Sequence, residues 1–181
     1  MFGPHGSRKS IDQIIVLCIT SIRLCYSQEP NLFQTLFTSL QTPPSSNATD
    51  GLLSTDCILA RANFTLPNTN ITITTRLFNG QYPGPTLRLS AGDKLQLNFT
   101  NSLKDQKALF VHNVLSGPDE TNLHFHGLHV SGELPSDDPT YVVEPSESYE
   151  YMTDLPEDHM GGTHWMHPHR HGSSAVSLND S

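Results

Sequence analysis

The stretch LRLSAGDKLQLNF, residues 87–99, contains two short runs in which leucine or phenylalanine alternates with a polar residue. Side chains along a β-strand point alternately to its two faces, so each run predicts a strand with one buried face. The residues SAGD at positions 90–93, between the two runs, have the composition of a turn. We therefore predict a β-hairpin over Leu87–Phe99.

Further short segments of this kind lie on both sides of the hairpin. Loops rich in Gly, Pro, Asp and Ser separate them. The predicted strands are Ile71–Phe78, Leu109–Val114, Leu123–Val130, Tyr141–Val143, Ser148–Thr153 and His164–His167. Short strands with regular turn signals predict an all-β sandwich or barrel.

The composition of the 181-residue chain suits one loop-rich β domain, because hydrophobic residues make up 35% and there are 13 Pro and 12 Gly. The net charge is −8 and the acidic residues are scattered. A basic stripe of the kind that binds nucleic acid or an anionic membrane is missing, so we expect neither partner. The chain has 10 His and only 3 Cys, which favours a metal held by imidazole over a thiolate zinc finger.

Residues 1–27 resemble an export signal, with Arg8 and Lys9 before the apolar stretch 14–19 and small residues before Gln28. That stretch is shorter than the roughly 18 residues of a membrane-spanning helix, so we expect no membrane span. A secreted, extracellular glycoprotein is predicted, and five Asn-x-Ser/Thr sequons agree with it: Asn47, Asn63, Asn70, Asn98 and Asn179. A mitochondrial presequence is the alternative. Residues 28–56 have the composition of a linker.

Loss of residues 1–27 would remove two of the three cysteines and leave Cys57. An unpaired cysteine in a secreted protein indicates a partner elsewhere. A buried free thiol explains Cys57 equally well.

Two His-x-His pairs carry the chemistry of the sequence: His124 with His126, and His167 with His169. Residues i and i+2 of a strand share a face and stand roughly 6.5–7 Å apart, so each pair presents two imidazoles in one direction. A single pair of this kind is more often structural, whereas two pairs in matching strand contexts predict a metal site. Imidazole ligands without interleaved cysteine indicate a catalytic or redox-active metal.

Among the remaining histidines, His112 and His159 have no companion at this spacing. We assign His112 and His159 to ordinary surface or core positions. Three further histidines flank the pairs and are expected in supporting or solvent-exposed roles: His129, His164 and His171.

Residues 57–173 resemble the first plastocyanin-like domain of the multicopper oxidases, the family of laccases, ascorbate oxidases and ferroxidases. Three segments carry the resemblance: FNGQYPGPT at 78–86, NLHFHGL at 122–128 and GTHWMHPHRHG at 162–172. The resemblance implies a cupredoxin-like Greek-key β-sandwich and copper as the cofactor. By similarity, His124 would hold a type 2 copper, His126 and His167 one type 3 copper, and His169 the other. Met166 stands where the family often has Tyr.

The family couples four one-electron oxidations of a phenol, amine, ascorbate or metal ion to reduction of dioxygen to water. The resemblance thus implies dioxygen and a reducing substrate as reactants. The remaining cluster ligands and the type 1 copper site require a His-x-x-His-x-His and a His-Cys-His motif, neither of which is in this chain. We therefore expect further cupredoxin domains as partners. The family also carries a carboxylate after its first His pair, which makes Asp137 and Asp138 candidate proton relays; an ordinary solvated turn is the alternative.

The sequence ends with a polar tail, residues 174–181, where the family continues into a strand that closes the sheet. We accordingly expect a fragment that lacks its closing strand, with an unpaired edge beside residues 123–130 or 164–167. Such an edge would promote association.

Other functions remain open at this point. A non-catalytic module that sequesters copper through the same four histidines is the main alternative. A zinc hydratase would need a third His about two dozen residues after a strand His-x-His, and a cupin would need a nearby Glu. Position 149 is Tyr, and Glu133 is too far along the chain.

Overall fold

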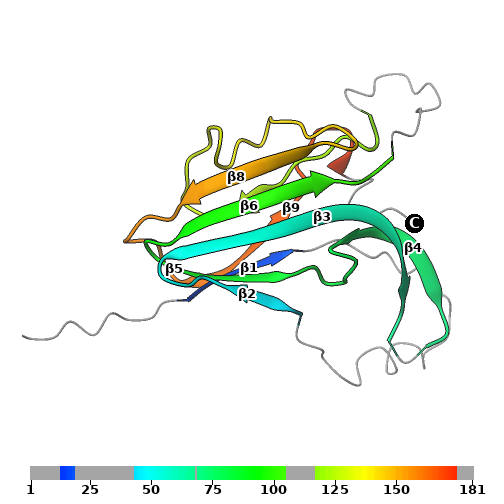
Figure 1. Ribbon diagram of the computed structural model, residues 1–181, viewed down its shortest axis with the longest axis horizontal. Coiled ribbons are helices and arrows are strands. Elements are labelled where there is room, and N and C mark those ends of the chain that lie inside the picture. Colours follow the sequence, from blue (N-terminus) through cyan, green and yellow to red (C-terminus); the bar gives the residue numbers. More distant parts are fainter. Residues whose placement is uncertain (1–12, 19–42, 68, 105–116, 175–181) are drawn as a thin grey trace, which may run out of the picture.

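The computed structural model describes residues 13–18, 43–67, 69–104 and 117–174 (Figure 1). Nine β-strands form two sheets, and no α-helix crosses the described part. The first sheet has five strands in the order β2 (Ser45–Asn47), β5 (Thr86–Ser90), β1 (Gln13–Cys18), β9 (Gly162–His167) and β7 (His124–His126). The second sheet has four, in the order β4 (Thr72–Phe78), β3 (Leu52–Thr65), β6 (Lys94–Asn101) and β8 (Ser148–Asp154).

The core lies between the two sheets and is built from the alternating positions of their strands. In β6, residues 95, 97 and 99 are at most 1% exposed, while the polar residues between them face outward. Leu87 and Leu89 of β5 approach the same core from the first sheet. Burial of each such side chain contributes about 1.5–3 kcal/mol, so the alternation fixes which face of each sheet is inside. The all-β sandwich predicted from the sequence is confirmed.

The predicted hairpin over Leu87–Phe99 is wrong in one respect. β5 and β6 are strands separated by a turn, in which the Ser90 N–H donates to Asp93 Oδ2 over 2.6 Å. They do not pair, because β5 belongs to the first sheet and β6 to the second. The turn therefore crosses from one layer to the other. The alternation of buried and exposed residues in the sequence is the same whether two strands pair within one sheet or pack against each other in two sheets.

The sandwich begins earlier than the predicted boundary at Cys57. β3 starts at Leu52, and β2 lies at 45–47, within the segment 28–56 that was predicted as a linker. β1 lies within the predicted export signal and pairs with β5 in antiparallel and β9 in parallel orientation. Short strands of low hydrophobicity, such as Ser45–Asn47, give no alternation to detect in the sequence.

β9 has partners on both sides, so the open edge expected at residues 164–167 is not found there. The reason is β1, which occupies the position beside it. β7 is the outer strand of the first sheet, and it covers only residues 124–126 of the predicted 123–130. The predicted strand 109–114 lies outside the described residues. In place of the predicted strand 141–143 there is a single bridge, between Thr121 and Val143.

Candidate metal centre

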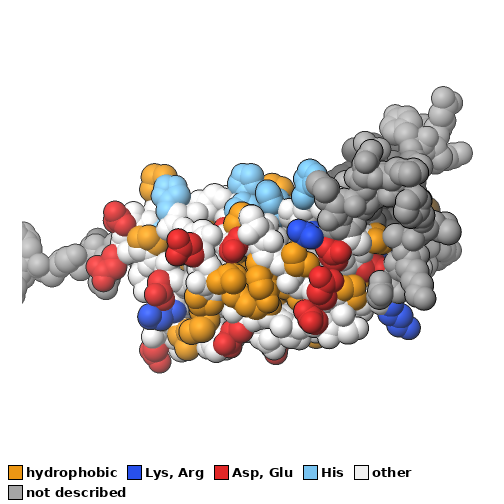
Figure 2. All heavy atoms as spheres, turned by 90° about the horizontal axis from the view of Figure 1, so that it is seen from above, with side chains coloured by type: hydrophobic (Ala, Val, Ile, Leu, Met, Phe, Trp, Pro, Cys, Tyr) orange, Lys and Arg blue, Asp and Glu red, His pale blue; other side chains and the backbone are white. Residues whose placement is uncertain are grey.

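β7 and β9 place the two histidine segments side by side. They pair in antiparallel orientation, with His124 opposite His167, Phe125 opposite Met166 and His126 opposite Trp165. The central pair, Phe125 and Met166, is fully buried and faces the core. Because successive side chains of a strand point to opposite faces, the flanking histidines face away from the core. Figure 2 shows histidine side chains gathered along one edge of the molecule.

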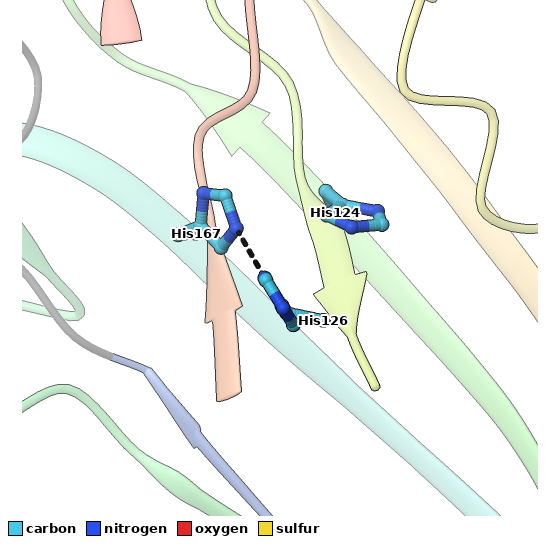
Figure 3. A group of neighbouring side chains, drawn as sticks. All are labelled: His124, His126 and His167. Atoms are coloured by element: carbon cyan, nitrogen blue, oxygen red, sulfur yellow. Dashed lines mark hydrogen bonds between the residues drawn. The ribbon is translucent and has the colours of Figure 1, made fainter. Parts of the chain in front are cut away.

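Three imidazoles converge at the end of this strand pair (Figure 3). His124, His126 and His167 each offer a nitrogen, and these three atoms lie within 4.8 Å of one another. Nδ1 of His126 and Nε2 of His167 are 3.4 Å apart. The ring centre of His124 lies 5.7 Å from that of His126 and 5.4 Å from that of His167.

His169 lies next to this trio but further out. Its ring centre is 5.1 Å from that of His124 and 5.8 Å from that of His167, and the residue is exposed. It follows Pro168, just beyond the end of β9 at His167. The structure thus brings together all four predicted histidines. Three of them have nitrogens within 4.8 Å of one another, and His169 lies at the exposed rim of the cluster.

A hydrogen bond determines which nitrogen of His167 carries the proton. Its Nδ1 lies 2.9 Å from the carbonyl oxygen of Pro168, which can only accept a hydrogen bond, so Nδ1 carries the proton. Nε2 then holds the lone pair that faces His126. Burial lowers the pKa of His167, opposed by the bond to Pro168, and the neighbouring His124, His169 and His126 lower it further. A neutral imidazole with a free lone pair is the form that binds a metal ion.

The two candidate acids have different surroundings. Oδ2 of Asp137 lies 2.9 Å from Nδ1 of His124, and Oδ1 accepts the Phe125 N–H over 3.0 Å. Asp137 is 6% exposed. Asp138 instead accepts hydrogen bonds from the side chain and backbone N–H of Thr140, which lower the pKa of Asp138. Only Asp137 contacts the histidine cluster.

Asn122 is a residue of this site that the sequence did not single out. It is fully buried, and its Oδ1 accepts the His169 N–H over 2.7 Å. Its Nδ2 donates to the carbonyl oxygens of Pro139 and Tyr141. Asn122 therefore joins the turn at His169 to the loop that follows Asp137. A polar residue two positions before His124, within the same motif, was the available signal.

His129, His159 and His164 form a second group of neighbouring rings. His159 is buried; its Nε2 accepts the His129 N–H over 3.0 Å, and its Nδ1 donates to the Met160 carbonyl oxygen. The His164 ring packs edge-on against His159. His171 is exposed, and His112 lies outside the described residues.

Cys57 is a buried free thiol, as one of its two interpretations predicted. Among the described residues no helix is long and apolar enough to cross a membrane.

A family model described as multicopper oxidase matches residues 60–178, well over half of the chain. Laccase-14 of Arabidopsis thaliana is 35% identical over 123 residues, which cover 66% of this chain and 18% of that protein. The iron transport multicopper oxidase FET5 of Saccharomyces cerevisiae is 33% identical over 100 residues, covering 51% of this chain and 14% of that protein. The chain therefore spans less than a fifth of the length of these relatives.

Solved structures share the fold. A multicopper oxidase from Campylobacter jejuni, described as a metallo-oxidase, aligns with a TM-score of 0.61 at 20% identity, covering 91% of this chain and 30% of that one. A laccase from Pediococcus acidilactici aligns with a TM-score of 0.59 at 17% identity, covering 77% of this chain and 27% of that one. These neighbours carry the cupredoxin-like fold predicted from the sequence.

Proposed function

Because the chain belongs to the multicopper oxidase family, we propose that it supplies His124, His126, His167 and His169 to a cluster of three copper ions at which dioxygen is reduced to water. The observation that carries the proposal is the convergence of three imidazole nitrogens within 4.8 Å on two paired strands. His169 at the rim would serve a neighbouring ion. The rest of the ligands would come from other cupredoxin domains.

The donor set fits copper. Three imidazoles without a thiolate suit a redox-active copper ion with open coordination positions. When bound, copper of this class supplies one-electron transfer to dioxygen. His167 already has the required tautomer, since its Nδ1 proton is held by the Pro168 carbonyl oxygen and Nε2 is free. A metal ion would replace the direct contact between His126 and His167.

Asp137 would orient His124 and carry protons toward the reduced dioxygen. A carboxylate 2.9 Å from Nδ1 favours the proton on that nitrogen and leaves Nε2 for the metal. Its second oxygen is fixed by the Phe125 N–H, so the carboxylate has one orientation. Asp138 lacks such a contact, so the geometry favours Asp137 of the two candidates.

The electron donor would be a phenol, an amine, ascorbate or a metal ion, oxidised at a type 1 copper in another domain. We expect the protein to act outside the cell. The four sequon asparagines within the described residues are all exposed, as glycan attachment requires: Asn47, Asn63, Asn70 and Asn98.

A copper-sequestering module is the second candidate. It is supported by the fact that three of the four imidazoles converge within this chain alone. Copper titration of the 181-residue chain tests the binding common to both functions. Dioxygen consumption by the copper-loaded chain joined to the remaining cupredoxin domains separates them, since a sequestering module would consume none.

A further inference from the structure

Trp165 lies against two of the candidate ligands. Its ring stacks on that of His126 with centres 5.0 Å apart and planes at 22°, and on that of His167 with centres 4.1 Å apart and planes again at 22°. It is directly opposite His126 in the strand pair and two residues before His167. Among the described residues, no other ring stacks on two histidines of this cluster, because the contacts between the histidines themselves are tilted or edge-on.

The two imidazoles lie on the same side of the indole. Their ring centres are 5.6 Å apart. Rings stacked on opposite faces of one indole would be separated by nearly the sum of the two stacking distances, which is much larger. The indole is therefore a platform on which both imidazoles rest. Figure 3 shows how Nδ1 of His126 and Nε2 of His167 face each other.

Core packing does not account for this arrangement. Trp165 is only partly buried, whereas its neighbour Met166 is 0% exposed and fills the core position of the strand pair. The large apolar face of Trp165 is instead covered by the two histidines. His126 is exposed, and the rings of its other neighbours, His124 and His167, are tilted against it and not stacked on it.

We propose that Trp165 is a positioning residue, which aligns the rings of His126 and His167 so that one metal ion can bind both. This inference rests on the proposed function of the cluster. Stacking limits the rotation of each imidazole before a metal arrives, so less entropy is lost on binding. A metal-bound imidazole carries positive charge, and the electron-rich face of an indole attracts a cation. Both effects strengthen metal binding without a bond from Trp165 to the ion.

The stack itself can be tested in the metal-free 181-residue chain by NMR. Imidazole protons that lie over an indole face are shifted upfield by its ring current. We expect such shifts for His126 and His167 in the unmodified chain, their loss in Trp165→Leu and their partial retention in Trp165→Phe. The His129 ring makes no contact with Trp165, so its signals should not change. Unshifted His126 and His167 signals in the unmodified chain would overturn the platform.

Its effect on the metal is tested by competition of the same chains with a copper chelator. A stacked cation–aromatic contact contributes about 0.5–2 kcal/mol, so its loss weakens binding by about 2- to 30-fold. We expect this loss in Trp165→Leu and a smaller one in Trp165→Phe. The control Phe64→Leu lies in β3 of the second sheet, away from the histidines, and removes an aromatic pair with Tyr82. It should leave copper affinity unchanged.

The outcomes separate the two ideas. If Trp165→Leu binds copper as tightly as the unmodified chain, Trp165 does not position the ligands, and the copper site stands. If the unmodified chain shows the ring-current shifts but binds no copper, the proposed function fails, and the positioning role fails with it. Thermal melting of each variant shows whether weaker copper binding by Trp165→Leu comes from a folding defect. If it does, the copper affinity of the folded Trp165→Phe variant tests the positioning role.

Discussion

Nδ1 of His126 and Nε2 of His167 lie 3.4 Å apart although 41 residues separate them in the sequence. The antiparallel register of β7 and β9 produces this contact, because it sets His124 opposite His167 and places His126 at the next position on the same face. The fold thus brings three imidazole nitrogens together from two short motifs. These side chains are held by Trp165, Asp137 and the Pro168 carbonyl oxygen.

Asp137 and Asp138 form a matched pair of variants. Asp137→Asn removes the charge beside His124 and should weaken copper binding by about 10- to 100-fold, the usual effect of losing a partner of a ligating His. Asp138→Asn should bind copper like the unmodified chain, because Asp138 contacts Thr140 and not the cluster. Isothermal titration of both measures the difference. Equal affinities would remove Asp137 from the site.

Gly127 lies close to the side chain of His164. Its φ is +90°, a conformation that side chains disfavour, and a Cβ there would meet Nδ1 of His164 at 2.9 Å. Gly127→Ala should therefore lower stability by about 1–3 kcal/mol, because the backbone is strained and His164 must move. Gly132→Ala, where the added Cβ meets nothing within 4 Å, is the control. Urea unfolding of the two variants would show equal midpoints if this reasoning is wrong.

The buried ion pair between Arg76 and Asp119 ties β4 to the loop before the first histidine pair. The pair is 2.8 Å long, with side chains 0% and 2% exposed. Asp119→Ala removes one partner of a buried guanidinium, which also donates to the Pro118 carbonyl oxygen, and should cost about 3–5 kcal/mol. Asp154→Ala removes an exposed pair with Lys94 and should cost less than about 1 kcal/mol. Chemical denaturation of both variants measures the ratio.

His164 makes the fold sensitive to acid. Burial lowers the pKa of His164, and so do the neighbouring His159 and His129. A His with a lowered pKa in the folded state stabilises the fold above the ordinary imidazole value of about 6.5, and this contribution is lost as pH falls below it. His164→Gln should therefore show a smaller fall in Tm between about pH 7.5 and about pH 5. Parallel pH dependences in the two chains would contradict the assignment.

The sequence predicted local features of the fold well. Alternation at Leu95, Leu97 and Phe99 identified a strand with one buried face, and the His-x-His spacing identified the histidines that the fold brings together. Alternation does not reveal which sheet a strand joins, so the placement of β5 and β6 in different sheets was missed. The position of β1 beside β9 depends on pairing between segments more than 140 residues apart, such as Ile14 with Gly162.

The sequence also could not predict the contacts that single side chains make across the fold. Asn122 joins three segments through its amide, and neither its neighbours nor its spacing predicts those partners. The stacking of Trp165 on His126 depends on the register of β7 and β9. The loop carboxylates could not be distinguished until their partners were known, because both lie in the same acidic turn.

The central claim is that these histidines bind copper, and electron paramagnetic resonance of the copper-loaded 181-residue chain tests it most directly. We predict a Cu(II) signal with imidazole nitrogen couplings and no intense blue colour, since that colour needs a copper–thiolate bond and Cys57 is buried in the core. His124→Ala and His169→Ala should each weaken copper binding, the combined His126→Ala/His167→Ala should lose the signal, and His129→Ala should keep it. An unchanged copper signal and affinity in all the cluster variants would contradict the account.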